Sequence, residues 1–287
     1  MSTRRYAQVI GDPIAQSKSP IIHGFWLEKL GIEADYRAFL VEDEVAAVEA
    51  YFPTALIDSD WVGCNVTMPH KKAVIPLLDT VDPVATRIGA VNTVVREGYG
   101  LAGYNTDAAG FLEPLSKDLS KQHFYRMARI LGTGGAARAI VTALYDEGFT
   151  LVLAGRTPEK ARAILDELAP KGEHHAIHLD HFAEPTDFQF DDREGCLDLI
   201  VNTSPLGMTG QPPLVFDWSH APPGAIAYDI VTDPVDTEFL KAARAAGFET
   251  IDGLNMLIGQ AAAAFEKFFG AKAPREHDAE LRERLTA

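Results

Sequence analysis

Two polar stretches of the chain carry residue types that can perform proton chemistry together. Asn65-Val66-Thr67-Met68-Pro69-His70-Lys71 ends on an amine, and Asn105-Thr106-Asp107 ends on a carboxylate. Reduction of a ketone creates alkoxide charge, which an ammonium group stabilises and then neutralises by giving up a proton. An amine can also take a proton, and a carboxylate beside it would orient it. Taken singly, Lys71 could equally be a solvated lysine and Asp107 a helix cap.

A glycine-rich turn supplies a second kind of chemistry. The segment Gly132-Thr133-Gly134-Gly135-Ala136-Ala137 has the pattern G-x-G-x-x-A between an expected strand and an expected helix. Gly132 makes the tight turn, Gly134 lets a pyrophosphate approach the backbone, and Ala137 lets the helix pack closely. The helix N-terminus offers N–H groups and positive dipole to phosphates. The sequence therefore predicts dinucleotide binding, with a purely structural turn as the alternative.

The end of the next expected strand indicates which dinucleotide binds. The strand leads into Gly155-Arg156-Thr157, and Lys160 follows one turn into the next helix. An acidic residue here would bind the ribose 2′-hydroxyl of NAD, and there is none. A guanidinium favours the 2′-phosphate of NADP, although a strand-end arginine can also be merely solvated.

The elements that must position these residues alternate along the chain between strands and helices. Such alternation predicts an α/β fold with parallel sheets covered on both faces. Segment 171–195 is polar and receives no assignment. Residues 90–96 and 100–104 are expected to pair around a turn at Glu97-Gly98. The remaining strands are expected at 6–10, 36–41, 61–65, 127–131, 150–154, 197–202 and 225–229. Helices are expected at 19–30, 42–52, 111–119, 135–147, 158–168, 236–246 and 254–269.

Composition excludes several classes of protein. The net charge of −15 over 287 residues argues against a nucleic-acid binder, because phosphate contacts need a basic surface. No apolar run approaches the roughly 20 residues of a membrane span, and the N-terminal apolar stretch is too short for a signal peptide. Cys64 and Cys196 form no disulfide framework, so we expect a cytoplasmic protein. The histidines at 174, 175, 178 and 181 lie in a polar segment without a metal-binding pattern, so no metal is expected.

Taken in order, the polar motifs resemble those of the shikimate dehydrogenase family. The resemblance runs from residue 9 to residue 261, nearly the whole chain. Besides the segments above, it rests on Ser17-Lys18-Ser19-Pro20, Ala90-Val91-Asn92-Thr93, Asn202-Thr203-Ser204 followed by Gly207-Met208, and Gly253-Leu254-Asn255-Met256-Leu257-Ile258-Gly259-Gln260-Ala261.

This resemblance implies two α/β domains with a cleft between them. Residues 1–107 with 253–287 would form the substrate-binding and catalytic domain, and 108–252 a Rossmann-like NADP domain. The implied reaction is the reversible, NADP-dependent reduction of 3-dehydroshikimate to shikimate in aromatic amino-acid biosynthesis. The implied partner is this small substrate, with no nucleic acid or membrane, in a monomer or homodimer.

The resemblance also implies roles for single residues. Lys71 and Asp107 would be the catalytic pair. The substrate would be bound by Ser17, Ser19, Thr67, Asn92, Thr232 and Gln260. The cofactor would be bound by Gly132, Thr133, Gly134, Gly135, Ala136, Arg156, Thr157, Lys160, Asn202, Thr203, Ile230 and Gly253.

Two positions depart from the family pattern. The D-x-x-Y-x-P motif has Thr232 in place of tyrosine, which motivates the alternative of a quinate/shikimate dehydrogenase or a paralogue with another substrate. The N-R-T motif has Gly155 in place of asparagine, which removes a possible adenosine contact but keeps the charge. An alternative of another class is a non-catalytic module that senses a ligand or nucleotide, and the presence of both Lys71 and Asp107 argues against it.

Overall fold

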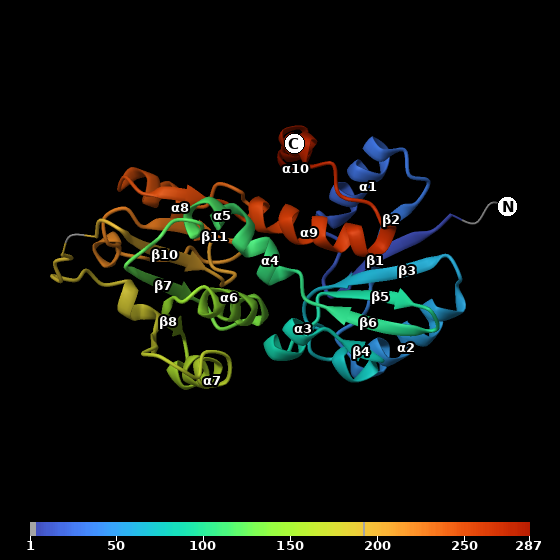
Figure 1. Ribbon diagram of the computed structural model, residues 1–287, viewed down its shortest axis with the longest axis horizontal. Helices are drawn as coiled ribbons and strands as arrows, with labels where there is room; N and C mark the ends of the chain where they lie inside the picture. Colours follow the sequence, from blue (N-terminus) through green and yellow to red (C-terminus); the bar gives the residue numbers. More distant parts are fainter. Residues whose placement is uncertain (1–3, 192) are drawn as a thin grey trace. The chain divides into compact units, whose positions relative to one another are not determined.

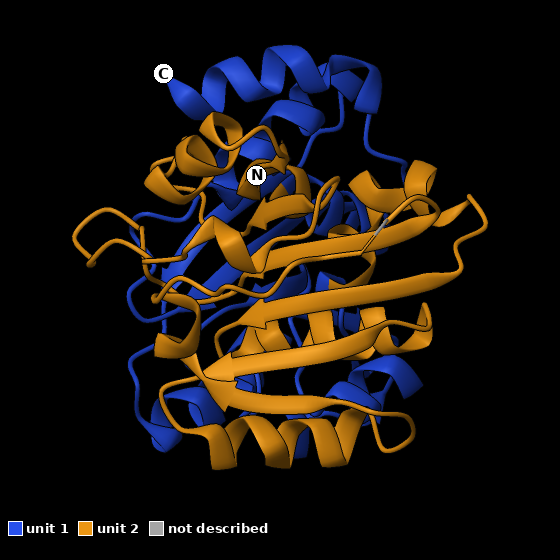
Figure 2. Cartoon of the chain, turned by 90° about the vertical axis from the view of Figure 1, so that its left-hand side faces the viewer, with its two compact units in different colours: residues 1–107, 258–287 blue, residues 108–257 orange. Residues whose placement is uncertain are grey.

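The computed structural model describes residues 4–191 and 193–287, and Figure 1 shows its strands and helices. The chain divides into two compact units, coloured separately in Figure 2. The first ends at Asp107 and resumes with residues 258–287, and the second comprises 108–257. The sequence placed the second boundary at 252/253. In the structure the division lies at 257/258, inside the continuous helix α9 (Gly253–Phe269).

The first unit is built on a six-stranded sheet of order β2-β1-β3-β5-β6-β4. Strand β1 pairs parallel with β2 and β3, whereas β5 pairs antiparallel with both β3 and β6. The hairpin expected from residues 90–96 and 100–104 forms, with its turn at Gly98-Tyr99 rather than Glu97-Gly98. A tight turn can join only antiparallel neighbours, so the sheet of this unit is mixed, whereas the alternation of strands and helices alone predicted parallel pairing. The strands are β1 (Tyr6–Gly11), β2 (Asp35–Leu40), β3 (Trp61–Val66), β4 (Thr80–Val81), β5 (Thr93–Glu97) and β6 (Gly100–Tyr104).

Helices cover both faces of this sheet. On one face, Val48, Tyr51 and Phe52 of α2 pack against strand residues such as Ile10 and Trp61. The other face carries α1, α10 and the part of α9 that belongs to this unit, which lie above the sheet in Figure 1. The helices are α1 (Ser19–Leu30), α2 (Val45–Ile57), α3 (Pro83–Ile88) and α10 (Asp278–Thr286).

The second unit is built on a sheet in which every pair of strands is parallel, as the sequence predicted. Its order is β12-β11-β10-β7-β8-β9, which reverses direction between β7 and β10. In such sheets a ligand binds at the carboxyl ends of the strands beside the reversal. The strands are β7 (Tyr125–Leu131), β8 (Thr150–Gly155), β9 (His175–His178), β10 (Cys196–Asn202), β11 (Ile226–Asp229) and β12 (Glu249–Ile251).

Several elements of the second unit differ from the sequence expectation. The helix expected at 111–119 is divided into α4 (Asp107–Leu112), a 3₁₀ turn and α5 (Ser116–Leu119), because Pro114 cannot donate a backbone hydrogen bond inside a helix. Strand β9 lies in the segment that received no assignment, and β12 was not predicted. The other helices are α6 (Gly135–Asp146), α7 (Pro158–Leu168) and α8 (Glu238–Ala245).

Candidate active site

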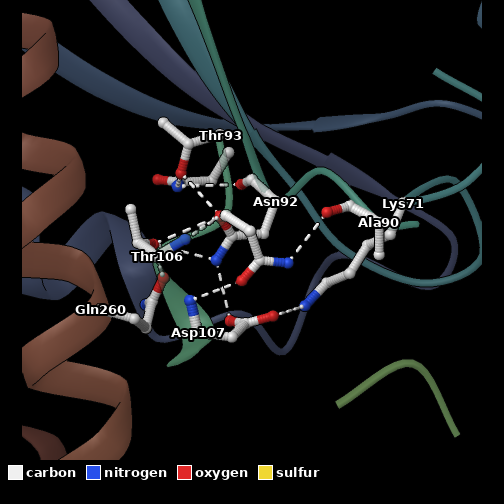
Figure 3. Close-up of polar contacts among 9 residues, drawn as sticks. Lys71, Ala90, Asn92, Thr93, Thr106, Asp107 and Gln260 are labelled. Carbon is white, nitrogen blue, oxygen red and sulfur yellow. Dashed lines mark hydrogen bonds and ion pairs between the residues drawn. The ribbon is translucent and has the colours of Figure 1, made fainter. Parts of the chain in front are cut away.

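Lys71 and Asp107 form an ion pair in the first unit. Lys71 Nζ lies 2.6 Å from Asp107 Oδ2, and the two side chains are 19% and 8% exposed. Figure 3 shows the carboxylate of Asp107 between Lys71 and Asn92. The two residues lie 36 positions apart in the sequence, and the fold brings them together as the motifs predicted. A carboxylate hydrogen-bonded to an amine at this distance fixes the position and the orientation of the amine.

The loop that carries Lys71 is fixed at several backbone positions. The N–H of Thr67 donates to the carbonyl of Ile10 at 2.9 Å, and the N–H of Val91 donates to the carbonyl of Lys71 at 2.8 Å. Between them, the buried ring of His70 forms a 2.7 Å hydrogen bond with the carbonyl of Val41. The role of His70 is therefore to anchor the loop beside Lys71.

Asn92 connects the carboxylate to the sheet. Its Nδ2 donates to Asp107 Oδ1 at 2.8 Å and to Thr106 Oγ1 at 2.9 Å, and its Oδ1 accepts the backbone N–H of Thr106 at 2.8 Å. Asn105 supports the same turn, since its Oδ1 accepts the backbone N–H of Asp107 at 3.0 Å and its Nδ2 donates to the carbonyl of Ala90. Asp107 opens α4, but its carboxylate is bonded to Lys71 and Asn92.

Three of the expected substrate residues lie in this cluster or in a loop packed near it. Thr106 Oγ1 lies 3.5 Å from Gln260 Oε1, so Gln260 adjoins Asn92 and Asp107 through Thr106 (Figure 3). Thr67 packs directly against Gly11. A β-carbon on Gly11 would collide with the methyl group of Thr67 and would lie 2.7 Å from the carbonyl oxygen of Met68. Thr106 and Asn105 were not named as site residues, although they belong to the same N-T-D motif as Asp107.

The serine loop precedes α1 in the same unit. Ser17 Oγ accepts the backbone N–H of Ser19 at 3.3 Å, and Lys18 Nζ donates to the carbonyl of Leu285 in α10. Ser19 is the first residue of α1, whose N-cap is Lys18. Ser17 is half-buried and Ser19 is buried.

The glycine turn of the second unit follows β7, as predicted. Gly132 has φ +121, and a β-carbon there would lie 2.7 Å from Thr203 Oγ1 and 2.9 Å from the N–H nitrogen of Ser204. Only glycine fits this position. Gly134 and Gly135 are exposed, and apart from adjacent residues and the backbone of α6, no described heavy atom lies within 4 Å of the place a β-carbon would take. The turn at the start of α6 thus has the open backbone that a pyrophosphate requires.

The end of β8 carries the expected cationic side chains in exposed positions. Arg156, Thr157 and Lys160 are all exposed. Gly155 is buried, and a β-carbon on it would lie 2.7 Å from Cγ2 of Thr133. The methyl group of Thr133 therefore occupies the space that the family's asparagine would need, which gives a physical reason for the departure at Gly155.

Asn202 and Asp229 join the ends of β10 and β11. Asn202 Nδ2 donates to Asp229 Oδ1 and to the carbonyl of Leu206, both at 3.0 Å, and its Oδ1 accepts from Ser204. Burial raises the pKa of Asp229, although hydrogen bonds from Val231, Thr237 and Asn202 oppose this. Asn202 is fully buried, so its side chain shapes the turn after β10 from inside the protein.

The remaining expected residues of the second unit follow β11. Ile230 and Thr232 are half-buried, and Gly253 is buried at the start of α9. A β-carbon on Gly253 would collide with the carbonyl oxygens of Ile230 and Val231, so only glycine lets α9 begin against this segment. Thr203 Oγ1 donates to the carbonyl of Leu131, which ties the turn after β10 to β7.

The part of the chain that the structure describes, residues 4–191 and 193–287, bears on metal binding and membrane insertion as well. Within these ranges no three histidine, cysteine, aspartate or glutamate side chains are grouped so that they could hold a metal ion. Among the helices described, none combines the length and apolar content of a membrane span. The backbone N–H of Leu151 donates to the ring of His174, which gives that histidine a structural role.

Known proteins resemble this chain along its whole length. Residues 9–94 match the model of the shikimate dehydrogenase substrate binding domain, and 253–280 match that of the shikimate 5′-dehydrogenase C-terminal domain. The chain is 48% identical over 285 residues to a protein named shikimate dehydrogenase (NADP(+)) from Sphingopyxis alaskensis, covering 98% of this chain and 97% of that one.

Solved structures agree with the sequence matches. A shikimate dehydrogenase in complex with NADP+ superposes with a TM-score of 0.86 at 31% identity, covering 100% of this chain and 98% of that one. The enzyme of Thermus thermophilus in complex with NADP(H) and shikimate superposes with a TM-score of 0.79 at 33% identity, covering 98% and 99%. The expected two-domain α/β fold, with a substrate domain and a Rossmann-like domain, is confirmed. The chain belongs to the shikimate dehydrogenase family.

Proposed function

We propose that this chain catalyses the reversible, NADP-dependent reduction of 3-dehydroshikimate to shikimate. The observation that carries the proposal is the 2.6 Å pair of Lys71 and Asp107 inside a cluster of polar side chains. The relatives that share this family are named shikimate dehydrogenases that use NADP. They favour this function over the quinate alternative raised by Thr232, and the buried ion pair argues against a merely ligand-sensing module.

The catalytic step needs a proton at the place where negative charge develops. The nicotinamide of NADPH supplies the hydride that reduces the carbonyl carbon. Lys71 Nζ stabilises the charge on the carbonyl oxygen and gives it a proton, which completes the alcohol. In the opposite direction the amine removes the hydroxyl proton. Asp107 holds the nitrogen in place with one carboxylate oxygen, while Asn92 holds the other.

Substrate recognition rests on neighbouring hydroxyl and amide groups. Ser17, Ser19, Thr67, Asn92 and Gln260 would bind the hydroxyls and the carboxylate of the substrate. A site built from such groups rejects analogues that lack a hydroxyl, because its own polar atoms are then left without partners. Thr232 is assigned to the same task by the family pattern, with a hydroxyl that reaches less far than tyrosine.

We assign NADP to the unit formed by residues 108–257. The residues present fit a dinucleotide, because the turn from Gly132 to Ala136 leaves the backbone of Gly134 and Gly135 open at a helix N-terminus, and Arg156 is an exposed guanidinium near the end of β8. Thr157 and Lys160 would add contacts to the 2′-phosphate. Thr203, Ile230 and Gly253 would border the turn, with Asn202 acting through its buried hydrogen bonds. The unit formed by 1–107 and 258–287 would bind the substrate.

The test is a steady-state comparison of shikimate and quinate, each with NADP and with NAD. We expect the highest kcat/KM for shikimate with NADP, followed by nicotinamide absorbance. Lys71→Ala should lower kcat about a thousandfold and leave NADP affinity intact, since the amine lies in the other unit. A clear preference for quinate, or undiminished turnover by Lys71→Ala, would contradict the proposal.

Two further expectations belong to the proposal. We infer a cytoplasmic enzyme, because the reaction draws on the reduced nicotinamide pool and both cysteines are thiols. A monomer or a homodimer is expected, which light scattering of the purified chain distinguishes.

A further inference from the structure

Behind the catalytic pair, a line of hydrogen bonds runs through the first unit from β2 to Asp107. Tyr36 Oη donates to Asn65 Oδ1 at 2.6 Å, and Asn65 Nδ2 donates to Thr93 Oγ1 at 3.0 Å. Thr93 Oγ1 donates to Asn92 Oδ1 at 3.0 Å, and Asn92 Nδ2 donates to Asp107 Oδ1 at 2.8 Å. All five residues are buried. Figure 3 shows the end of this line at Thr93, Asn92 and Asp107.

The donor and acceptor roles along this line of hydrogen bonds are fixed by the contacts of Asn92, at the end nearest Asp107. Asn92 Oδ1 accepts the backbone N–H of Thr106, so that oxygen is an acceptor and Nδ2 must face Asp107. Thr93 has one hydroxyl proton and gives it to Asn92, and its oxygen must then accept from Asn65. The oxygen of the Asn65 amide is therefore turned toward Tyr36, which can only donate to it.

Asn65 uses its amide entirely within the protein. Its Nδ2 donates to the carbonyl of Asn92 at 3.2 Å as well as to Thr93, so both amide hydrogens are engaged. Asn65 belongs to the same motif as Lys71. Its amide group hydrogen-bonds Tyr36 and Thr93, so within the motif it serves to hold other side chains in place.

Tyr36 is well suited to terminate the line. Burial raises the pKa of Tyr36 well above its usual value, and the nearby Cys64 adds to this, while a hydrogen bond with Ser19 opposes it. The hydroxyl thus keeps its proton and remains a donor. The ring stacks on His23 with centroids 3.9 Å apart and an interplanar angle of 2°, which holds the hydroxyl in one direction.

We propose that Tyr36 and Thr93 are positioning residues, whose hydroxyl groups orient Asn65 and Asn92 and thereby hold Asp107 opposite Lys71. This inference rests on the proposed function. Without the Tyr36 hydroxyl, a buried amide oxygen loses its donor, and the Asn65 amide can turn over. Without the Thr93 hydroxyl, Asn92 Oδ1 loses one of its donors, and the amide that holds Asp107 is less constrained.

The test uses substitutions that remove a hydroxyl with little change in volume. Tyr36→Phe and Thr93→Val should each lower kcat for shikimate oxidation about tenfold and leave the KM for NADP unchanged. Thr93→Ser keeps the hydroxyl and loses only a methyl group, so it should stay within about twofold of the parent. A role in packing alone predicts the reverse order, since valine fills the core better than serine.

Coupling and a matched control make the test specific. If the two hydroxyls act in one line, the double variant Tyr36→Phe/Thr93→Val should lose about as much kcat as either single variant. The control is Tyr51→Phe in the same unit, where a buried tyrosine donates to Gln8 Oε1 at 2.8 Å. It should lower thermal stability and leave kcat unchanged.

A second measurement does not depend on turnover. In protein labelled with 15N-asparagine, hydrogen exchange of the Asn92 side-chain amide should accelerate in Tyr36→Phe and Thr93→Val but not in Tyr51→Phe. If the parent protein lacks shikimate activity, the proposed function fails, and this exchange measurement still decides the inference. Unchanged kcat and exchange in both variants, loss in Thr93→Ser equal to that in Thr93→Val, or multiplying losses in the double variant would overturn it.

Discussion

The polar cluster around Lys71 and Asp107 in the first unit, which is the proposed catalytic site, and the glycine turn of the second unit, which is the proposed nucleotide site, are built in opposite ways. Around Lys71 and Asp107, polar side chains form hydrogen bonds with one another. Each carboxylate oxygen of Asp107 accepts a hydrogen bond from the protein, and both the nitrogen and the oxygen of the Asn92 amide are hydrogen-bonded. Around Gly134, Gly135 and Arg156, the groups proposed to meet the cofactor are exposed.

The difference follows from what each region has to bind. Proton transfer depends on a fixed distance and direction, so the amine is held by a network before substrate arrives. A dinucleotide brings its own negative charge, and open N–H groups with a mobile cation are sufficient to receive it. Changes in the first region should therefore act mainly on kcat or stability, and changes in the second mainly on cofactor affinity.

After the thousandfold loss expected for Lys71→Ala, the next largest effect is expected where the exposed cation would meet the cofactor. Arg156→Gln should raise the KM for NADP about thirtyfold and barely change that for NAD, because the guanidinium is proposed to meet the 2′-phosphate that NAD lacks. The same change should reduce the salt dependence of NADP affinity, since exposed charges are screened. Steady-state titration of both nucleotides at two ionic strengths measures this.

A matched control lies on the same helix as Lys160. Arg162 is also exposed on α7, but it donates to the carbonyl of His174, so Arg162→Gln should leave both nucleotide constants unchanged. If Arg156→Gln raised the KM for NADP and the KM for NAD equally, the guanidinium would not contact the 2′-phosphate.

A smaller effect is expected in stability, from the histidine beneath the catalytic cluster. Burial lowers the pKa of His23 to about 3. In the unfolded chain, His23 binds a proton as the pH falls below about 6.5, whereas in the folded chain it stays neutral down to about pH 3. The free energy of unfolding is therefore highest above pH 6.5 and decreases as the pH falls toward 3. The cost is about 1.4 kcal/mol per pH unit in that window. His23→Phe keeps a ring against Tyr36 and removes the titration.

Urea unfolding of both proteins from pH 7.5 to 5.5 measures the difference. Relative to the parent, the free energy of unfolding of His23→Phe should rise by about 1.4 kcal/mol as the pH falls from 7.5 to 5.5, with most of that rise below pH 6.5. His175→Phe, at an exposed histidine of β9, serves as the control, and its free energy of unfolding should change with pH as that of the parent does. Parallel curves for His23→Phe would mean that His23 does not titrate as its burial requires.

The sequence predicted those features of the site that depend on short motifs. The strand, turn and helix around Gly132 form as expected because glycine spacing and apolar periodicity are local. The pairing of Lys71 with Asp107 followed from a family pattern, and the structure brings the two side chains together. The single helix expected at 111–119 is wrong because Pro114 interrupts its backbone hydrogen bonds, which the apolar pattern does not reveal.

Other features depend on contacts between distant segments and could not be predicted. Nothing near His70 in sequence indicates that its ring bonds Val41, and nothing near Tyr36 points to Asn65. The antiparallel pairing of β3 with β5 likewise depends on which edge of the sheet the chain returns to. Hydrogen-bond partners across a sheet are set by register, and register is a property of the assembled fold.

The smallest expected effect concerns the family departure at Gly155. Its backbone does not require glycine, because its φ is not positive, but a β-carbon would lie 2.7 Å from Cγ2 of Thr133. Gly155→Asn alone should therefore cost about 1 kcal/mol of stability by overpacking. Thr133→Ala removes the obstructing methyl, so the double variant Thr133→Ala/Gly155→Asn should recover most of that loss.

A double-mutant cycle in thermal stability and in NADP affinity measures this coupling. Thr133→Ser keeps Oγ1, which would lie 3.3 Å from the new β-carbon, and removes the closer Cγ2. Combined with Gly155→Asn it should give an intermediate result. If the stability losses of Gly155→Asn and Thr133→Ala simply add, the two positions are independent. Asparagine at position 155 is then tolerated equally well with threonine or alanine at position 133. If they couple, then even the region that leaves its groups open to the cofactor has one tightly packed contact, at the buried base of the turn.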